Sequence, residues 1–477
     1  MKTKTKNNKI FEKILFALLL VIIILSSITI ARISQDKPIF AVGESYHSLE
    51  QARKIREAGY NIFRDTNPYH YLLALLLLLL PEKTLGLYLP LLTGILTSLL
   101  FYKALCTLKA KKQNAAYSII ILALTPVFIT LYTGLYTSGF ALLLSCAAII
   151  LLFSDKKTSH IIGVLVAALL GLTSLTALVI TLLIVLVAYA KLKKNCSAII
   201  ASLIVPAVLL IGLILGTTYT PLLPAFHSFS FKNSFSLLKA MQGFDIFLLM
   251  LFFMGFVLLW NKQKNKNLHH LPVLILVIIS FFNTQTRVYA SVIITIYVVH
   301  VITYFYKRKW HSQAIRTGVL LLVLCSLLFS GLNQASLIVS AQPDKATETA
   351  LNHLKQEAQG TVLSLEDYSS VIEYYSGKDA FPSPNPEITG TKKDVQNQAD
   401  AQKIFGSARL KDAEPLLREH NITYIIITPY MKETLWQGRE QGLLFLMLNS
   451  ERFIKKYKEQ DISVWEYLPA LPMNKTT

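Results

Sequence analysis

The sequence predicts a polytopic α-helical membrane protein with about eleven spans and a polar C-terminal α/β domain. Composition indicates the membrane class, because 53% of the 477 residues are hydrophobic and only 16% are charged. A soluble protein of this size carries about 25% charged residues. Many apolar runs approach the roughly 20 residues that cross a bilayer, and basic residues cluster between these runs, as they do in the cytoplasmic loops of membrane proteins.

The apolar runs place the expected spans. The stretch 160–190 is too long for one crossing, so we divide it near Thr173. The leucine run 71–80 is too short, because about ten helical residues rise only about 15 Å, half the hydrocarbon core; we expect an interfacial or re-entrant helix there. The spans are then 13–31, 84–105, 114–132, 137–153, 160–174, 175–190, 197–217, 244–260, 269–285, 288–306 and 315–332.

The basic residues set the expected orientation. If the N-terminus is cytoplasmic, the cytoplasmic loops hold 21 basic residues against two acids, Glu12 and Asp155, which accounts for the whole formal net charge of +19. This agrees with the positive-inside rule. The basic balance is therefore a signal of topology, and it implies no nucleic-acid partner.

The chain divides into two expected domains. Residues 1–332 form a transmembrane domain with a first external loop at 33–83, and residues 333–477 form an extracytoplasmic domain. Short β-branched runs in the second domain predict strands, and amphipathic runs between them predict helices, an alternation typical of an α/β layer domain. The strands are Thr361–Leu365, Ile422–Thr428, Phe453–Lys458 and Ile462–Tyr467; the helices are Ala346–Ala358, Asp367–Tyr375, Lys411–His420 and Glu433–Leu448.

Polar residues at the outer ends of the spans are the candidate functional residues. Glu44 and His47 open the first external loop, Asp245 lies at the end of the eighth span, and Arg287 lies between the ninth and tenth spans. Ionisable groups at a membrane boundary are costly and often functional. Arginine binds phosphate oxygens in a bidentate manner, and a carboxylate holds a divalent cation or acts as a general base. This set fits a lipid-linked phosphate or pyrophosphate sugar.

Each of these residues also has a purely structural interpretation. Glu44 is explained equally as a charge that the helix dipole favours at an N-terminus, and Asp245 as the cap of its helix. His47 is explained as a packed, hydrogen-bonded residue, and Arg287 as an interfacial charge. Both interpretations stay open at the level of the sequence.

The order of these features resembles that of the GT-C membrane glycosyltransferases, and most of all the oligosaccharyltransferase catalytic subunits. The run Gly43–His47 is similar to the opening of their first external loop, in which an aspartate helps to hold the catalytic metal and the acceptor; Glu44 matches that aspartate. Arg287 matches an arginine near the lipid pyrophosphate. The run Leu365–Ser369 aligns with their Trp-Trp-Asp-Tyr-Gly acceptor motif.

The resemblance implies an extracytoplasmic transfer of a sugar or oligosaccharide from a polyprenyl-phosphate or polyprenyl-pyrophosphate donor to a protein or glycan acceptor, by an enzyme of the cell membrane. It implies a catalytic role for Glu44 and donor-phosphate binding by Arg287 and His47. A divalent cation, Mg or Mn, is implied on Glu44 and Asp245. The acceptor-binding residues implied by the motif are Asp367 and Tyr368.

Two departures from the family pattern keep other functions open. Both tryptophans of the acceptor motif are absent, and the loop Tyr132–Gly139, which matches the family's acidic second external loop, contains no acid. A non-catalytic subunit of the same fold that serves in binding or assembly is one alternative. A transporter of polyprenyl-linked glycans is the other.

The topology predicts that the C-terminal domain is extracytoplasmic. We therefore expect a cysteine placed at Ser369 to react with a membrane-impermeant thiol reagent in intact cells. Labelling only after lysis would overturn the orientation.

Overall fold

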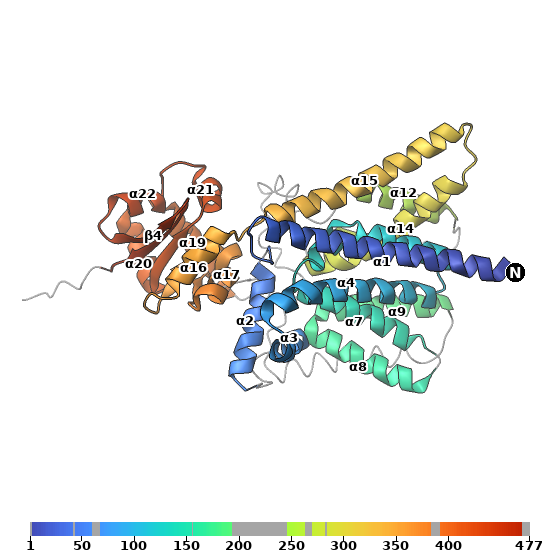
Figure 1. The fold of residues 1–477 in the computed structure, drawn as a ribbon, viewed down its shortest axis with the longest axis horizontal. Helices are drawn as coiled ribbons and strands as arrows, with labels where there is room; N and C mark the ends of the chain where they lie inside the picture. The colour runs from blue at the N-terminus through green and yellow to red at the C-terminus, as the bar shows by residue number, and fades with distance from the viewer. Residues whose placement is uncertain are drawn as a thin grey trace, which may run out of the picture. The chain divides into compact units, whose positions relative to one another are not determined.

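The computed structural model describes residues 2–41, 43–59, 67–154, 156–192, 246–262, 270–281, 284–382 and 392–469. The chain forms two compact units (Figure 1). The helical unit comprises Met1–Arg32 and Ala58–Ser340, and the sheet unit comprises Ile33–Glu57 and Ala341–Thr477. This division differs from the expected one after residue 332, because the last long helix continues to Ser340 and the segment 33–57 packs with the C-terminal residues.

The helical unit consists of apolar helices. Four of its described helices contain stretches long and apolar enough to cross a membrane: α1 (Lys2–Ser34), α4 (Glu82–Thr107), α14 (Thr284–Lys307) and α15 (Gln313–Ser340). The others are α3 (Pro68–Leu79), α5 (Lys112–Ala123), α6 (Pro126–Leu131), α7 (Thr137–Leu152), α8 (Lys157–Thr173), α9 (Leu175–Leu192), α12 (Ile246–Lys262) and α13 (Leu271–Ser280).

Described helices occur at every expected span except 197–217, which lies outside the described residues, so the count of eleven stays a prediction. The expected span 114–132 is broken in two. α5 ends at Ala123, and Thr125 caps α6, where its hydroxyl accepts from the Phe128 N–H at 3.3 Å. Pro126 then occupies the first position of α6, where its missing N–H has no cost.

The expected division of 160–190 is confirmed, because α8 ends at Thr173 and Ser174 takes an extended conformation before α9. The leucine run forms a separate short helix, α3, which starts at Pro68 with the Asn67 side chain accepting from the Tyr69 N–H at 3.0 Å. Its twelve residues rise about 18 Å, less than a bilayer core. An interfacial position for α3 stays a prediction.

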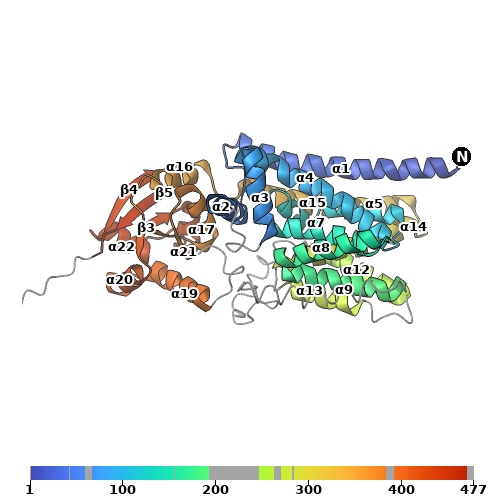
Figure 2. The ribbon, with the colours of Figure 1, turned by 90° about the horizontal axis from the view of Figure 1, so that it is seen from below.

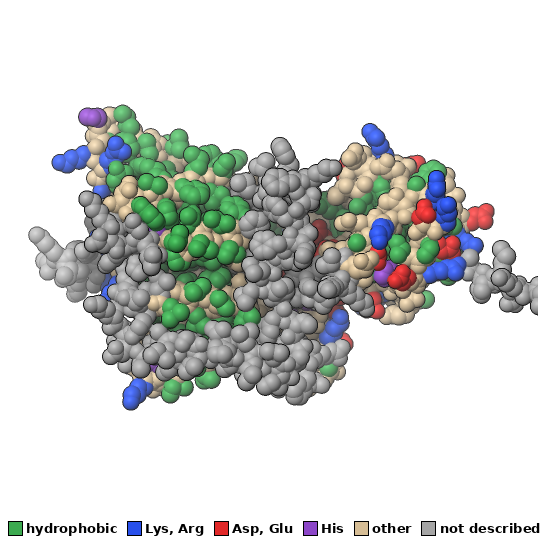
Figure 3. All heavy atoms as spheres, turned by 180° about the vertical axis from the view of Figure 1, so that it is seen from behind, with side chains coloured by type: hydrophobic (Ala, Val, Ile, Leu, Met, Phe, Trp, Pro, Cys, Tyr) green, Lys and Arg blue, Asp and Glu red, His purple; other side chains and the backbone are tan. Residues whose placement is uncertain are grey.

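The surface of the helical unit is apolar. Among the described side chains on the face of this unit seen in Figure 3, most are hydrophobic, whereas charged side chains are scattered over the sheet unit. Leu322, Phe329 and Leu332 of α15 are each more than half exposed. So much exposed apolar surface is expected where lipid replaces water as the solvent.

The sheet unit is built on a mixed five-stranded sheet of order β2-β1-β3-β5-β4. β1 (Thr361–Leu363) lies between β2 (Ala380–Phe381) and β3 (Ile422–Ile427) and is parallel to both. β5 (Ile462–Tyr467) and β4 (Phe453–Glu459) extend the sheet in the antiparallel sense. The chain therefore leaves β1 toward β2 on one side and returns across it to β3 on the other, and ligands of open α/β sheets bind where the strand order reverses in this way.

Helices cover both faces of this sheet (Figure 2). α16 (Lys345–Leu354) and α17 (Glu366–Ser376) lie on one face, and α19 (Lys392–Gly406), α20 (Leu410–Glu419) and α22 (Leu443–Asn449) lie on the other. The core on the second side joins Leu363 and Ile425 of the sheet to Leu417 and Met447 of the helices. The remaining helices of the unit are α2 (Gly43–Glu57) and α21 (Pro429–Trp436).

The structure corrects the expected helix Glu433–Leu448, which is two helices. The chain turns at Gln437, Gly438 and Gly442, which have φ of 52°, 73° and 59°. This left-handed region does not continue a helix. A Cβ on Gly442 would collide with the Phe405 carbonyl oxygen, so only glycine fits there.

Ser369 is unsuitable as the labelling site for orientation. It is fully buried, and its hydroxyl donates to the Pro382 carbonyl oxygen at 2.7 Å. A cysteine there would be shielded on either side of the membrane. Thr434 of α21 is exposed and takes its place: we expect Thr434→Cys, in a background without native cysteines, to react with the impermeant reagent in intact cells.

Candidate functional site

Two helices of the sheet unit begin side by side at the carboxyl ends of parallel strands. α17 follows β1 after Leu365, and α21 follows β3 after Thr428. The Thr428 hydroxyl caps α21 by accepting from the Met431 N–H at 3.2 Å. Since β1 and β3 are neighbours, the first turns of both helices lie at one edge of the sheet. Ligands of open α/β sheets bind at this kind of edge.

Asp367 and Tyr368, the expected acceptor residues, form the first turn of α17. Tyr368 is 3% exposed, and its ring centroid lies 6.4 Å from that of Tyr430. Burial raises its pKa to about 12, against the opposing effect of the Thr428 side chain. The Asp367 side chain is exposed, yet the protein atoms around its carboxyl displace enough water to raise its pKa. Tyr368 is therefore a neutral, fixed side chain, and Asp367 is the one that a ligand can reach.

Glu44, the expected catalytic residue, reaches the same place from another part of the chain. α2 starts at Gly43, and a Cβ on Gly43 would lie 3.2 Å from the Asp367 carbonyl oxygen and 3.6 Å from the Ser370 Cβ. The first turns of α2 and α17 therefore lie against each other. Glu44 stands in that turn of α2, where the helix dipole favours a carboxylate, and His47 follows one turn later, half-buried.

Arg287 belongs to the helical unit, at the start of α14. It is half-buried, and its Nε donates to the Ser280 carbonyl oxygen, at the end of α13, at 3.4 Å. Two residues later the Tyr289 hydroxyl lies 2.8 Å from the Ser145 hydroxyl of α7. These bonds hold α14 to α13 and α7 and orient the guanidinium at the helix end.

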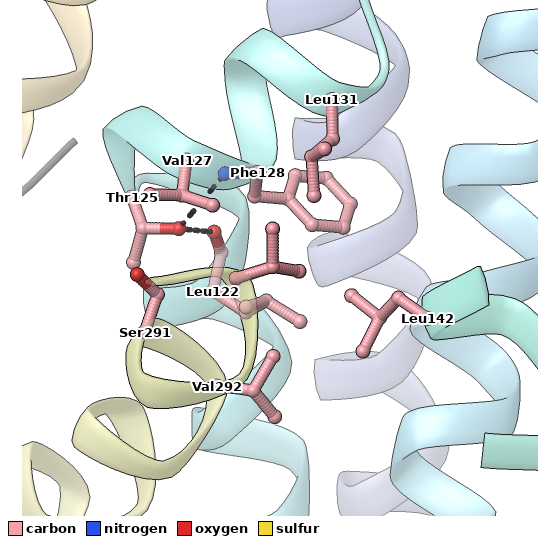
Figure 4. Close-up of a pocket in the computed structure, with 9 residues that line it drawn as sticks. Leu122, Thr125, Val127, Phe128, Leu131, Leu142, Ser291 and Val292 are labelled. Carbon is pink, nitrogen blue, oxygen red and sulfur yellow. Dashed lines mark hydrogen bonds between the residues drawn. The ribbon is translucent and has the colours of Figure 1, made fainter. Parts of the chain in front are cut away.

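The loop between α6 and α7, which matches the family's second external loop, is held by packing. The Tyr132 hydroxyl lies 2.9 Å from Thr97 Oγ1 and 3.0 Å from the Gly139 carbonyl oxygen. A small gap between residues of α5, α6, α7 and α14, shown in Figure 4, has no room for a water molecule and so is no substrate cavity. It is lined by Leu122, Thr125, Val127, Phe128, Leu131, Leu142, Val288, Ser291 and Val292.

The carboxylates within the described ranges do not amount to a metal site. No three His, Cys, Asp or Glu side chains among those residues gather closely enough to hold an ion. Asp245, the second expected metal ligand, lies outside the described residues. Glu44 and Arg287 belong to different units. The convergence of Glu44, Asp245 and Arg287 on one cavity therefore stays a prediction.

Sequence reasoning missed three residues of this region, Thr428, Tyr430 and Glu373. A signal for the first two was present, because Thr-Pro directly after a buried strand marks the start of a helix at the carboxyl edge of a sheet. No pattern in the sequence marked Glu373 of α17 as a residue of this region. Its pKa is raised to about 7, mainly by burial, with Lys54 of α2 lowering it and Glu50 of α2 raising it.

Three solved structures share the fold of this chain at 12% sequence identity. An oligosaccharyltransferase of Archaeoglobus fulgidus tethered with an acceptor peptide containing the NVT sequon matches with a TM-score of 0.57 over 96% of this chain and 75% of that chain. An oligosaccharyltransferase of that organism in complex with an inhibitory peptide and a dolichol-phosphate matches with a TM-score of 0.55 over 97% and 75%. An arabinofuranosyltransferase from Mycobacteria matches with a TM-score of 0.53 over 97% of this chain and 42% of that chain.

These likenesses concern the fold. No protein-family model matches the chain, and no curated protein matches it by sequence. The structural matches, together with the apolar helices, show a polytopic helical membrane fold. The resemblance to the GT-C glycosyltransferases, and to the oligosaccharyltransferases among them, is thereby confirmed at the level of the fold.

The raised pKa of Glu373 predicts a pH-dependent stability of the sheet unit. The folded value, about 7, lies above the ordinary value of 4.5, so the stabilisation is complete below about pH 4.5 and is lost as pH rises through about 7. We expect Glu373→Gln to stabilise α2 and α17 at pH 8 by on the order of 1 kcal/mol, after allowance for partial exposure, and to leave them unchanged at pH 4.

Hydrogen exchange of the α2 and α17 amides, corrected for the intrinsic effect of pH, measures this difference. Glu451→Gln, at an exposed position of the same unit, is the control. Parallel pH profiles for wild type and Glu373→Gln would contradict the burial argument.

Proposed function

We propose that this chain is a membrane glycosyltransferase that moves a sugar or oligosaccharide from a polyprenyl-phosphate or polyprenyl-pyrophosphate donor to a protein or glycan acceptor on the extracytoplasmic side. The observation that carries the proposal is the meeting of the first turns of α2 and α17, which joins Glu44 to Asp367 and Tyr368 in one unit. The fold supports it, because proteins of that fold include a transferase solved with dolichol-phosphate and one solved with an acceptor peptide.

Glu44 serves as the general base in the proposed reaction. It takes the proton of the acceptor group as that group attacks the anomeric carbon, and the bond from this carbon to the phosphate oxygen of the lipid breaks with its electrons going to the phosphate. The position at the positive end of α2 favours the carboxylate that this role needs. Base catalysis of this kind contributes about 10²- to 10⁴-fold.

Arg287 and His47 bind the donor phosphate in the proposed reaction. The Nε–H of Arg287 is committed to Ser280, which orients the plane of the guanidinium. An arginine binds phosphate through two parallel hydrogen bonds and stabilises the negative charge that develops on the leaving group. Asp367, exposed beside the fixed Tyr368, binds the acceptor.

A divalent cation, Mg or Mn, stays a prediction from the family resemblance. Such ions require several oxygen ligands, and the described residues bring no group of this kind together. In the proposed reaction Glu44 acts in proton transfer.

A non-catalytic subunit is the second candidate function, and a specific observation favours it. The loop Tyr132–Gly139 lacks the acids of the family's second external loop, and Tyr132 serves in packing. A chain of this kind binds or assembles glycosylation components without transferring sugar. Transport of polyprenyl-linked glycans ranks third, because the ionisable candidates stand at span ends and not at the midplane, where transporters bind.

The proposed role of Glu44 predicts that Glu44→Gln loses most sugar transfer, by about 10²-fold or more, and stays folded. Transfer from polyprenyl-linked sugars in membrane vesicles is the measurement. Glu57→Gln, an exposed residue at the other end of α2, is the matched control and keeps its activity. An active Glu44→Gln protein would reject Glu44 as the catalytic residue, and a wild-type chain inactive with every polyprenyl donor would favour the non-catalytic subunit.

The proposed role of Arg287 predicts a loss of donor affinity. We expect Arg287→Ala to weaken binding of a polyprenyl-phosphate sugar by roughly 1.5–3 kcal/mol, the range for a hydrogen bond to a charged group. Arg287→Lys should recover only part of this, because the two parallel bonds are lost. Binding of a fluorescent polyprenyl-phosphate sugar to the purified protein measures the affinity, and a wild-type value for Arg287→Ala would exclude the role.

A further inference from the structure

We propose that α2 is a fixed part of the sheet unit, held against α17 by Arg53 and Tyr374, so that the first turn that carries Glu44 stays against the first turn that carries Asp367 throughout the reaction. Arg53 is then a positioning residue. The inference about transfer rests on the proposed function, whereas the fixed docking of α2 does not.

The burial of α2 is the first observation. The helix is polar in composition, yet one stripe of it is buried. Tyr46, Leu49, Ala52 and Ile55 recur every three or four residues and are each 0–1% exposed. This spacing places them on one face of a helix. A helix whose apolar stripe is fully covered is docked as an integral element of its unit.

The contacts of Tyr374 are the second observation. Its ring centroid lies 5.1 Å from that of Tyr46 on one side and 4.1 Å from the Arg53 guanidinium carbon on the other. The Arg53 Nη1 also donates to the Tyr374 carbonyl oxygen at 3.3 Å. Tyr46 and Arg53 are two turns apart on α2, so one residue of α17 is held at two points of the partner helix.

The direction of packing is the third observation. Gly43 at the start of α2 meets Asp367 at the start of α17, and Arg53 further along α2 meets Tyr374 further along α17. The two helices therefore run parallel and in contact over about two turns. A tilt or slide of α2 would have to break the Arg53–Tyr374 contact before it could move Glu44 away from Asp367.

The consequence concerns how the two substrates meet. With α2 fixed on α17, the base and the acceptor residue form a single preorganised body, and any adjustment in the reaction is made by the donor and not by Glu44. Groups that are already aligned in the folded protein do not have to be reoriented during the reaction.

A disulfide tests the docking directly. The Cβ–Cβ separation of 3.6 Å between positions 43 and 370 falls in the range of about 3.5–4.5 Å that disulfides require. We expect Gly43→Cys with Ser370→Cys, in the full chain without native cysteines, to cross-link rapidly in membranes and to transfer sugar equally well oxidised and reduced. Glu57→Cys with Ser370→Cys is the control and stays uncoupled, because Glu57 is exposed at the other end of α2, about 21 Å along the helix from position 43.

Two results would overturn the proposal. The first is a failure of the Gly43–Ser370 pair to cross-link, and the second is a loss of transfer on oxidation that reduction restores, which would mean that α2 must leave α17. If the reduced pair transfers no sugar at all while wild type does, hydrogen exchange of α2 in the wild-type chain decides, with protection equal to that of α17 expected. A wild-type chain without transfer rejects the proposed function, and the cross-link still reports on docking.

Arg53 variants test the positioning role. We expect Arg53→Ala to slow cross-linking and to lower kcat by about tenfold, the size of one cation–π contact, with an unchanged donor KM. Arg53→Lys should restore part of both, because the cation over the ring remains and the planar fork is lost. Arg56→Ala, at an exposed position of the same helix, should change neither. Equal effects of Arg53→Ala and Arg56→Ala would remove Arg53 from this role.

Discussion

The candidate site depends on the close approach of two helix starts, which a glycine permits. At Gly43 the backbone of α2 comes so near to the Asp367 carbonyl oxygen that even a methyl group would need neighbouring atoms to shift. This contact joins the segment that follows α1 to a motif more than three hundred positions later. The mixed sheet determines the remaining geometry of the candidate site, because its strands fix where α17 and α21 begin.

The helical unit shows a second use of helix ends. Arg32, in the last turn of α1, is 1% exposed and donates to the carbonyl oxygen of Ile338, in the last turn of α15, at 2.7 Å. A cation is favoured at the negative end of a helix, and a buried cation requires such partners. Arg287, at the start of α14, likewise donates to a backbone carbonyl oxygen, that of Ser280 at the end of α13. These two arginines of the helical unit therefore both donate to backbone carbonyl oxygens at helix ends.

The sequence predicted the parts of the fold that follow from length and period. Helices lie at the described apolar runs, and the break at Ser174 was foreseen because one bilayer cannot hold so long a run. The break at Gln437 was not predicted, because the positive φ of a glutamine cannot be read from the pattern of apolar residues. β2 is two residues long, too short for an alternation to show, and α19 is mostly polar along its first turns. The packing of α2 with α17 is a long-range contact, and the family resemblance named its residues without predicting that they touch.

The sheet unit is discontinuous in the chain, since Ile33–Glu57 precedes the helices of the other unit and Ala341–Thr477 follows them. During synthesis, at about 5–20 residues per second, α2 emerges on the order of tens of seconds before α17 exists. Over that interval the Tyr374 ring, which Tyr46 contacts in the folded protein, has not yet been made. The packing of α2 on α17, and with it the placement of the turn that carries Glu44, is therefore completed only after the helices of the other unit have been made.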